Sequence, residues 1–155
     1  MKIFRAEVNY LNLDKLPLLF FEYYHELSAS GLFLPLTSNG AQLWLDGVKK
    51  SVGKTTMLVI AENNGLPVGF GQGQLKLAPD YLGNLRLGVV SHFYIDKKFR
   101  GSNTAEKMFD EMRVWFAEKM VHSIELQVLS NNVIAEKFWK KMGFIPELQQ
   151  MRCLV

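Results

Sequence analysis

Three basic residues close together, Lys97, Lys98 and Arg100, form the part of the sequence with the clearest capacity for chemistry. They stand in a polar loop, residues 96–103, between an apolar run at 89–95 and a segment whose apolar residues recur every three or four positions. The run predicts a buried strand, and the spacing predicts a helix. The first amides of a helix have no intrahelical partner, and the helix dipole adds partial positive charge beside them. The pattern therefore predicts an anion site suited to a diphosphate.

A second interpretation of this loop stays open. Asn103 and Glu106 have the spacing of a capping box, in which two side chains satisfy the free amides of the first helical turn. A helix start capped in this way is an ordinary structural feature. The two interpretations differ at Asn103, because a cap needs extended backbone angles and a tight anion loop needs left-handed ones.

Two blocks of sequence resemble the GNAT acetyltransferase superfamily. Residues 95–105 read Ile-x-x-x-x-Arg-x-x-Asn-x-Ala, similar to the family's acyl-CoA motif of Arg or Gln, two residues, Gly, one residue, then Gly or Ala after a strand. Residues 132–144 read Asn-x-x-Ala-x-x-Phe-Trp-x-x-Met-Gly-Phe, which resembles the family's late Asn, Ala, aromatic pair and Gly-Phe. The resemblance covers nearly the whole chain. It implies an α/β (α+β) fold, a mixed central sheet flanked by helices, as a single GNAT-like domain over residues 1–155.

The resemblance also implies that acetyl-CoA is the co-substrate. Backbone groups at the end of the motif's strand would hold the pantetheine arm in a gap where two neighbouring strands splay apart. The loop and helix start would hold the diphosphate, and the late block would line the far wall. The residues implied are Tyr94, Ile95, Arg100, Gly101, Ser102, Asn103, Thr104, Ala105, Asn132, Phe138 and Trp139.

The chain departs from the family pattern at two positions. Asn103 replaces the central Gly of the motif, and Asn is the non-Gly residue that best tolerates left-handed angles. Trp139 stands where the family often has a Tyr that serves as general acid, and an indole N–H cannot donate a proton to a leaving thiolate. Trp139 leaves the fold expectation intact, but it makes a non-catalytic acyl-CoA-binding domain the alternative to an N-acetyltransferase.

The implied reaction is direct attack of a neutral primary amine on the thioester, with a small-molecule, peptide or protein acceptor. A base is needed because an amine with a pKa near 10 is mostly protonated at neutral pH. His92, three residues before Ile95, is the first candidate, with a packed strand histidine as the alternative. Glu62, at the end of a predicted strand, is the second candidate. Tyr94, Tyr81 or water would protonate the thiolate.

Apolar patterning predicts the elements that position these groups. A hairpin is expected at Asn63-Asn64-Gly65, and Asp14 is expected to cap the first helix. The predicted strands are residues 3–8, 56–61, 68–77, 89–95, 123–129 and 149–154. The first two predicted helices are residues 16–27 and a helix that starts at residue 38 or 39 and ends at 50. A third helix begins after residue 103, and a fourth ends at residue 142.

Two further patterns concern the surroundings of the site. Gly69, Gly71 and Gly73 alternate on one face of a strand, which predicts very close packing, by a helix in preference to ligand backbone. The loop between the first two helices contributes to the acceptor pocket in the resembled family. Tyr23, Tyr24 and Phe33 are therefore pocket candidates, with a core or lid role as the alternative.

Composition limits the remaining functions. Apolar content of 48% and charged content of 21% over 155 residues are typical of one soluble globular domain. The net charge of +3 favours a small polyanion over nucleic acid. A single cysteine, Cys153, excludes an internal disulfide and a thiolate metal cluster. With no apolar run of membrane-spanning length and no signal peptide, a cytoplasmic location away from membranes is expected.

Three classes of function stay open: an N-acetyltransferase, an acyl-CoA-binding domain, and an unrelated interaction domain whose capping boxes imitate the motif. The sequence does not decide between a monomer and a homodimer, nor does it identify the acceptor amine.

Overall fold

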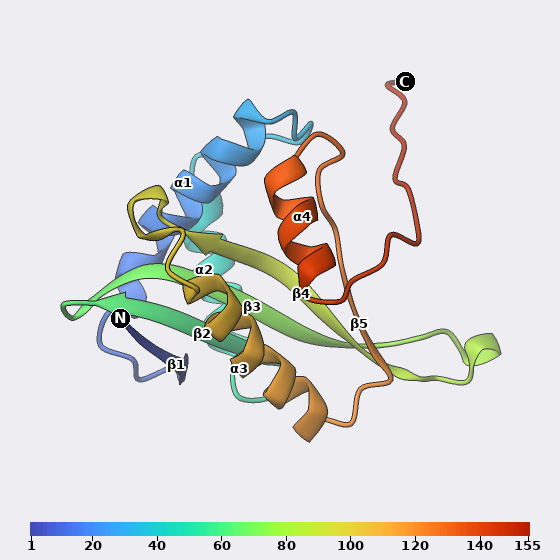
Figure 1. Cartoon of the computed structure of the whole chain (residues 1–155), viewed down its shortest axis with the longest axis horizontal. Coiled ribbons are helices and arrows are strands. Elements are labelled where there is room, and N and C mark those ends of the chain that lie inside the picture. The colour runs from blue at the N-terminus through green and yellow to red at the C-terminus, as the bar shows by residue number, and fades with distance from the viewer.

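The computed structural model, which describes residues 1–155, is a twisted five-stranded sheet with two helices on each face (Figure 1). None of the helices combines the length and apolarity needed to cross a membrane. The elements in chain order are β1 (Lys2–Ala6), α1 (Leu16–Ala29), α2 (Gly40–Ser51), β2 (Thr56–Asn63), β3 (Leu66–Leu77), β4 (Arg86–Ile95), α3 (Thr104–Glu118), β5 (Ser123–Leu126) and α4 (Val133–Lys141).

The sheet is mixed, as predicted. Its strands lie in the order β1-β2-β3-β4-β5, with antiparallel pairs except for the parallel pair of β4 and β5. The hairpin between β2 and β3 turns through Asn64 and Gly65, which have φ of 49° and 76°. Two consecutive left-handed residues are what the predicted Asn-Gly turn requires.

Each face of the sheet has its own core. Successive residues of a strand point to opposite faces, so Met57 and Val59 of β2 pack toward α3 and α4, while Leu58 and Ile60 pack toward α1 and α2. The two cores hold 12 and 11 buried apolar residues, so β2 is covered on both faces.

The alternating glycines of β3 let α3 approach closely, as predicted. A Cβ added at Gly71 would lie 3.0 Å from the sulfur of Met112, and one added at Gly73 would lie 3.0 Å from the Phe116 ring. Met112 and Phe116 are fully buried on α3. The bare face of the strand therefore holds a helix.

Several predicted element boundaries are wrong. Residues 149–154 form no strand and do not pair with β5, which is the last strand of the sheet. The tail there is joined to the body by a hydrogen bond from the Gln127 amide to Gln150, 3.0 Å long. Asp14 does not cap α1, since it lies in a short 3-10 turn and its carboxylate accepts from Lys49 at 3.0 Å. β1 and β5 also end earlier than predicted.

Candidate functional site

The loop between β4 and α3 turns twice through left-handed backbone. Gly101 has φ of 87° and Asn103 has φ of 52°, and the Asn103 side chain makes no capping hydrogen bond. The Glu106 carboxylate pairs with Lys141 of α4 at 2.6 Å, away from the helix start. The capping-box interpretation is therefore wrong, and the left-handed backbone expected of an anion loop is present.

This geometry leaves the amides of residues 101–106 without an acceptor in the protein. The first backbone bond at the start of α3 runs from the Lys107 amide to the Asn103 carbonyl, 3.1 Å away. The hydroxyls of Ser102 and Thr104 lie 2.9 Å apart and hold the turn together. Successive free amides around left-handed residues form a concave site for an anion, and the dipole of a 15-residue helix adds positive charge there.

Arg100 lies where β4 leads into this loop, and its guanidinium makes three hydrogen bonds to two groups. Its Nε donates to the Ile95 carbonyl at 2.8 Å, and its Nη2 donates to both carboxylate oxygens of Glu26 on α1, at 2.9 and 3.1 Å. The Tyr94 hydroxyl also donates to Glu26, at 2.9 Å, and Lys97 lies 3.7 Å from it. The Glu26 carboxylate thus pairs with two of the three cations predicted to bind a diphosphate, Arg100 and Lys97.

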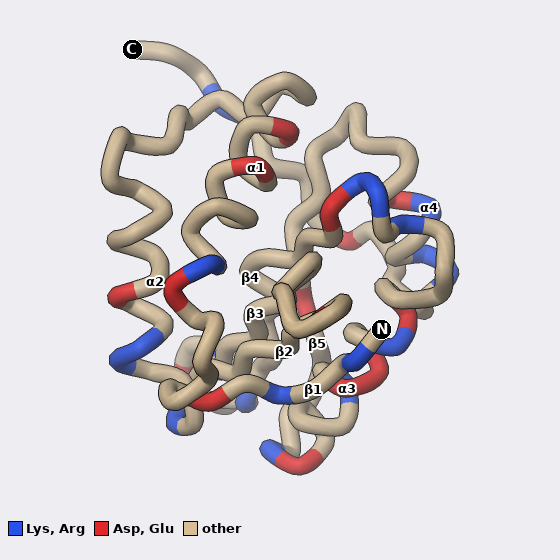
Figure 2. Tube along the Cα trace, turned by 90° about the vertical axis from the view of Figure 1, so that its left-hand side faces the viewer, with Lys and Arg blue, Asp and Glu red and all other residues tan.

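Positive charge gathers around the same loop. The loop that connects β4 to α3 carries Lys97, Lys98 and Arg100, and Figure 2 shows blue segments gathered on the side of the molecule where α4 lies. The contact of Lys141 with Glu106 brings the basic end of α4 to the first turn of α3.

A gap opens between β4 and β5 beside this loop. The two strands pair only through Leu87–Val90 and Ser123–Leu126, so residues 91–95 of β4 have no hydrogen-bonded neighbour on that side. The Asp96 amide donates to the Val68 carbonyl of β3. Because backbone groups in an antiparallel pair alternate between the two edges, those of Tyr94 face β3, and those of Phe93 and Ile95 face the open edge.

α4 forms an aromatic wall against this open section of β4. Phe138 stacks on Phe93 with ring centroids 6.0 Å apart, and Trp139 meets the same ring edge-on at 5.2 Å. Trp139 is 8% exposed, and its indole N–H has no partner in the protein, so the N–H reaches solvent, since no buried polar side-chain atom is unpaired. Asn132, predicted to line the CoA site, caps α4 by accepting from the Ala135 amide at 3.1 Å.

His92 points toward α1 and α2, on the other face of the sheet. Its ring lies among Phe20, Tyr23 and Trp44, at centroid distances of 5.1, 5.9 and 6.3 Å. Its Nδ1 lies 2.8 Å from Oε1 of Gln72. Burial lowers the pKa of His92 from 6.5 to about 4, because the imidazolium would lose hydration there.

Glu62 is not brought to His92. The register aligns Leu58, Gln72 and His92 across β2, β3 and β4. Glu62 is four residues beyond Leu58 on β2, which is two strands away from β4, so the backbones of Glu62 and His92 are about 16 Å apart. Its carboxylate accepts from the Tyr10 hydroxyl at 2.8 Å. Burial and this hydrogen bond raise the pKa of Tyr10 to about 12.

The two tyrosines considered as thiolate acids lie at opposite ends of β4. Tyr81 is 85% exposed at the tip of the β3–β4 hairpin, separated from Ile95 by the length of β4, about 30 Å. Tyr94 lies beside the loop, and burial together with its bond to Glu26 raises its pKa.

Tyr23 and Tyr24 of α1 both lie beside the His92 ring. Phe33 lies in the loop after α1 and is more than half exposed, with the Arg152 guanidinium 6.0 Å from its ring.

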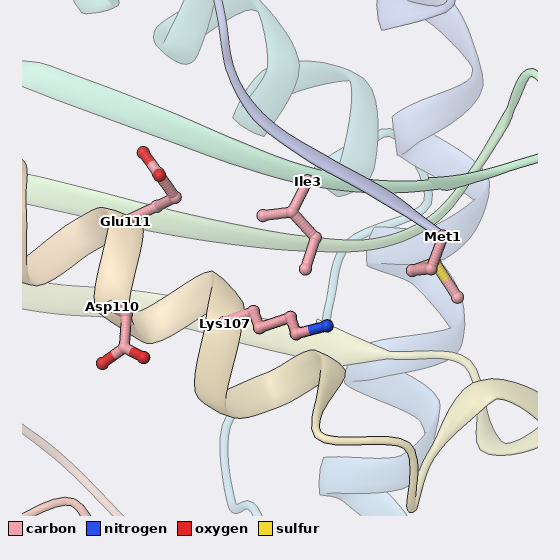
Figure 3. Close-up of a pocket in the computed structure, with 5 residues that line it drawn as sticks. All are labelled: Met1, Ile3, Lys107, Asp110 and Glu111. Carbon is pink, nitrogen blue, oxygen red and sulfur yellow. The ribbon is translucent and has the colours of Figure 1, made fainter.

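A separate hollow of about 330 Å³ lies between the N-terminal strand and α3 (Figure 3). Its side chains come from the N-terminus, β1 and one stretch of α3, and two of them are the carboxylates of Asp110 and Glu111. Negative charge of that kind does not favour a phosphate ligand, and none of the predicted site residues lines the hollow.

Sequence reasoning missed four residues of this region: Glu26, Trp44, Gln72 and Phe93. Glu26 and Arg100 are 74 positions apart, and Trp44 and Gln72 are 28 apart, so no local spacing links them. Phe93 could have been found from the sequence. Backbone groups alternate between the two edges of a strand, so Phe93 and Ile95 must face the same edge.

The chain matches the sequence model of a protein family described as acetyltransferase (GNAT) domain, over residues 54–146. The matched segment includes the β4–α3 loop, the gap and α4. No curated protein sequence matches the chain.

Solved structures share the fold over nearly all of the chain. A tetramutant of the BH1408 protein from Bacillus halodurans is 17% identical, with a TM-score of 0.76 and coverage of 100% of both chains. The aminoglycoside N-acetyltransferase AAC(6')-Iy in complex with CoA is 12% identical, with a TM-score of 0.77 and coverage of 99% of this chain and 93% of its own. The ribosomal-protein-alanine N-acetyltransferase from Brucella melitensis biovar Abortus 2308 is 14% identical, with a TM-score of 0.70 and coverage of 100% of both.

Proposed function

Because this chain belongs to the GNAT acetyltransferase family, we propose that it transfers the acetyl group of acetyl-CoA to a primary amine. The acceptor is a small molecule or an amine of a peptide or protein. The observation that carries this proposal is the run of free amides at 101–106, bent around two left-handed residues beside a cluster of basic side chains.

The diphosphate of CoA is assigned to those amides. A phosphate oxygen accepts several hydrogen bonds at once, and the amides around Gly101 and Asn103 have no competing acceptor. Arg100 and Lys97 supply charge-assisted contacts once they leave Glu26. Thr104 and Ala105 begin α3, so the helix dipole acts on the same anion.

The pantetheine arm and the thioester are assigned to the open edge of β4. The backbone groups of Phe93 and the amide of Ile95 are available there, and the side chains of Phe138 and Trp139 cover the adjoining face. A backbone amide on this edge would stabilise the oxyanion that forms as the thioester carbonyl is attacked. Tyr94 contributes its side chain, which holds Glu26 beside the loop.

In the proposed step, the amine lone pair forms a C–N bond to the thioester carbonyl, and the C–S bond breaks with its electron pair on sulfur. One proton leaves the nitrogen and one proton reaches the sulfur, which gives the amide and free CoA. His92 is the proposed proton acceptor, because its low pKa keeps the imidazole neutral at pH 7. The indole N–H of Trp139 is free to donate a hydrogen bond to the thiolate, while water supplies the proton.

A second candidate function is a non-catalytic acyl-CoA-binding domain. The observation that favours it is Trp139, which cannot act as a general acid and is held in place by Phe93, Phe109 and Phe144. The two functions share the CoA site and differ only in turnover.

Calorimetry and thiol release separate these possibilities. Acetyl-CoA is expected to bind with micromolar-scale affinity that falls as salt rises, and Arg100→Ala should weaken binding. Lys54→Ala is the control, because it removes the same charge from an exposed turn far along the chain from the loop. Thiol release across a panel of amines should then identify a turnover substrate. Binding without turnover of any amine supports the non-catalytic domain, and absence of binding near millimolar CoA contradicts both functions.

A further inference from the structure

A buried glutamine connects three elements behind the candidate base. Gln72 of β3 is 4% exposed, and its Oε1 accepts from the indole Nε1–H of Trp44 on α2 at 2.8 Å. The same oxygen lies 2.8 Å from Nδ1 of His92 on β4. One carbonyl oxygen thus interacts with two rings, one from a residue before Gln72 in the sequence and one from a residue after it.

The shared oxygen determines which nitrogen of His92 carries the proton. An indole nitrogen can only donate, so the Gln72 atom facing it must be the carbonyl oxygen, and a flipped amide would set two donors against each other. The atom facing His92 is therefore an acceptor, and Nδ1 must carry a hydrogen. In a neutral imidazole, Nε2 is then the nitrogen with the free lone pair.

The free nitrogen is not completely buried. Nε2 of His92 has no hydrogen-bond partner in the protein, and no buried polar side-chain atom is unpaired. Nε2 therefore contacts solvent, although the flanking Phe20, Tyr23 and Trp44 rings shield the rest of the imidazole.

We propose that Gln72, held by Trp44, is a positioning residue for acetyl transfer, which fixes His92 as the Nδ1–H tautomer and presents its Nε2 to the acceptor amine. This inference rests on the proposed function. In the transfer step, Nε2 accepts the proton lost by the attacking nitrogen and then releases it to water, while Gln72 keeps its bond to Nδ1–H in both states of the ring.

The surroundings of His92 allow this role. The titratable side chains that face its ring are Tyr23 and Tyr24, from α1, and β3 and α2 contribute the uncharged Gln72 and Trp44. The charges of Glu26 and Arg100 lie beyond Tyr94. Because no carboxylate contacts the imidazole, its tautomer is set by Gln72.

Nitrogen NMR of the ¹⁵N-histidine-labelled protein tests the tautomer without any substrate. The inference predicts that His92 Nδ1 has the shift of a protonated, pyrrole-type nitrogen and that Nε2 has the shift of a pyridine-type nitrogen at pH 7. A protonated Nε2 would overturn the inference. The result is independent of turnover, so failure of the proposed function would appear separately, as absent CoA binding or absent thiol release.

Two variants test whether the tautomer matters for rate. Gln72→Leu should shift the His92 nitrogens toward the other tautomer and lower kcat about tenfold or more, with CoA affinity unchanged by calorimetry. Trp44→Phe removes only the second donor and should give a smaller loss in the same direction. Unchanged nitrogen shifts and kcat in folded Gln72→Leu would overturn the role. If Gln72→Leu does not fold, Trp44→Phe alone decides, and unchanged shifts and kcat in it would contradict the proposal.

Discussion

Three α-helices of this protein begin at an asparagine, and two of these helix starts, those of α3 and α4, are built in opposite ways. At α4, Asn132 accepts from the Ala135 amide, which is the usual role of an N-terminal cap. At α3, Asn103 takes left-handed angles, makes no cap, and leaves six successive amides free. The residue type is therefore no guide to function here. The backbone conformation distinguishes a closed helix start from one that can bind an anion.

The largest expected effect is a loss of folding stability in mild acid. It comes from His92, which lies away from both helix starts. The pKa of His92 is about 4 when folded and 6.5 as a free side chain, so between these values the unfolded chain binds a proton that the folded chain does not. The stabilisation is complete above pH 6.5 and is lost as pH falls toward 4, by about 3 kcal/mol. Urea unfolding of wild type and His92→Phe at several pH values measures it. An equal pH slope in both proteins would contradict the burial of His92.

Replacing Asn103 by valine should show most clearly that the start of α3 serves CoA binding and not stability. A β-branched residue takes left-handed angles only at a cost of about 1–2 kcal/mol or more, so the exposed loop relaxes and the amides turn away. CoA affinity should fall about tenfold or more, with little loss of thermal stability. Asn84→Val is the matched control, because Asn84 also has φ of 52° but lies in the β3–β4 hairpin. An equal loss of CoA affinity in both variants would remove the special role of the loop.

Removing the cap of α4 should instead cost stability. Asn132→Ala leaves the Ala135 amide without its acceptor and should lower the free energy of unfolding by about 1 kcal/mol. The control is Asn131→Ala, at the exposed neighbouring position. Denaturant unfolding compares the two variants, and equal stabilities would mean that the cap contributes nothing.

The contact of Glu26 with Arg100 should compete with CoA. Glu26→Gln removes the negative charge that now binds the guanidinium, so CoA affinity should rise about two- to fivefold, the range of an exposed ion pair. Glu22→Gln, one turn earlier on α1 and exposed, changes net charge equally without that contact. Weaker CoA binding by Glu26→Gln would show that the ion pair prepares the site.

The smallest effect is expected from Asn103→Gly, which restores the residue of the family motif. Glycine takes the same left-handed angles without steric cost, so CoA affinity should stay equal or improve slightly. Calorimetry at one salt concentration is sufficient. A marked loss would mean that the Asn103 side chain itself contacts the ligand.

The sequence predicted local features better than distant contacts. The Asn-Gly hairpin and the close packing of α3 on the β3 glycines follow from short patterns and were confirmed. The strand at 149–154 was wrong, because a local pattern does not show whether a segment will pair with the edge of a sheet. Asp14 was wrong as a cap, because Lys49 from α2 binds its carboxylate.

In the candidate site, too, local features could be predicted from the sequence and distant contacts could not. The tolerance of Asn103 for left-handed angles could be foreseen from its residue type, whereas the sharing of Gln72 between Trp44 and His92 depends on the packing of α2 over the sheet. The low pKa of His92 was equally unforeseeable, since it comes from burial among rings of α1 and α2.

A titration of the ¹⁵N-labelled protein with CoA, followed by amide NMR, tests the central claim most directly. If the open start of α3 binds the diphosphate, the amides of residues 101–106 should show the largest shifts, because they acquire hydrogen bonds to phosphate. The amide of Ala135, already bonded to Asn132, should move less. Unchanged amides at 101–106 near millimolar CoA would contradict the account.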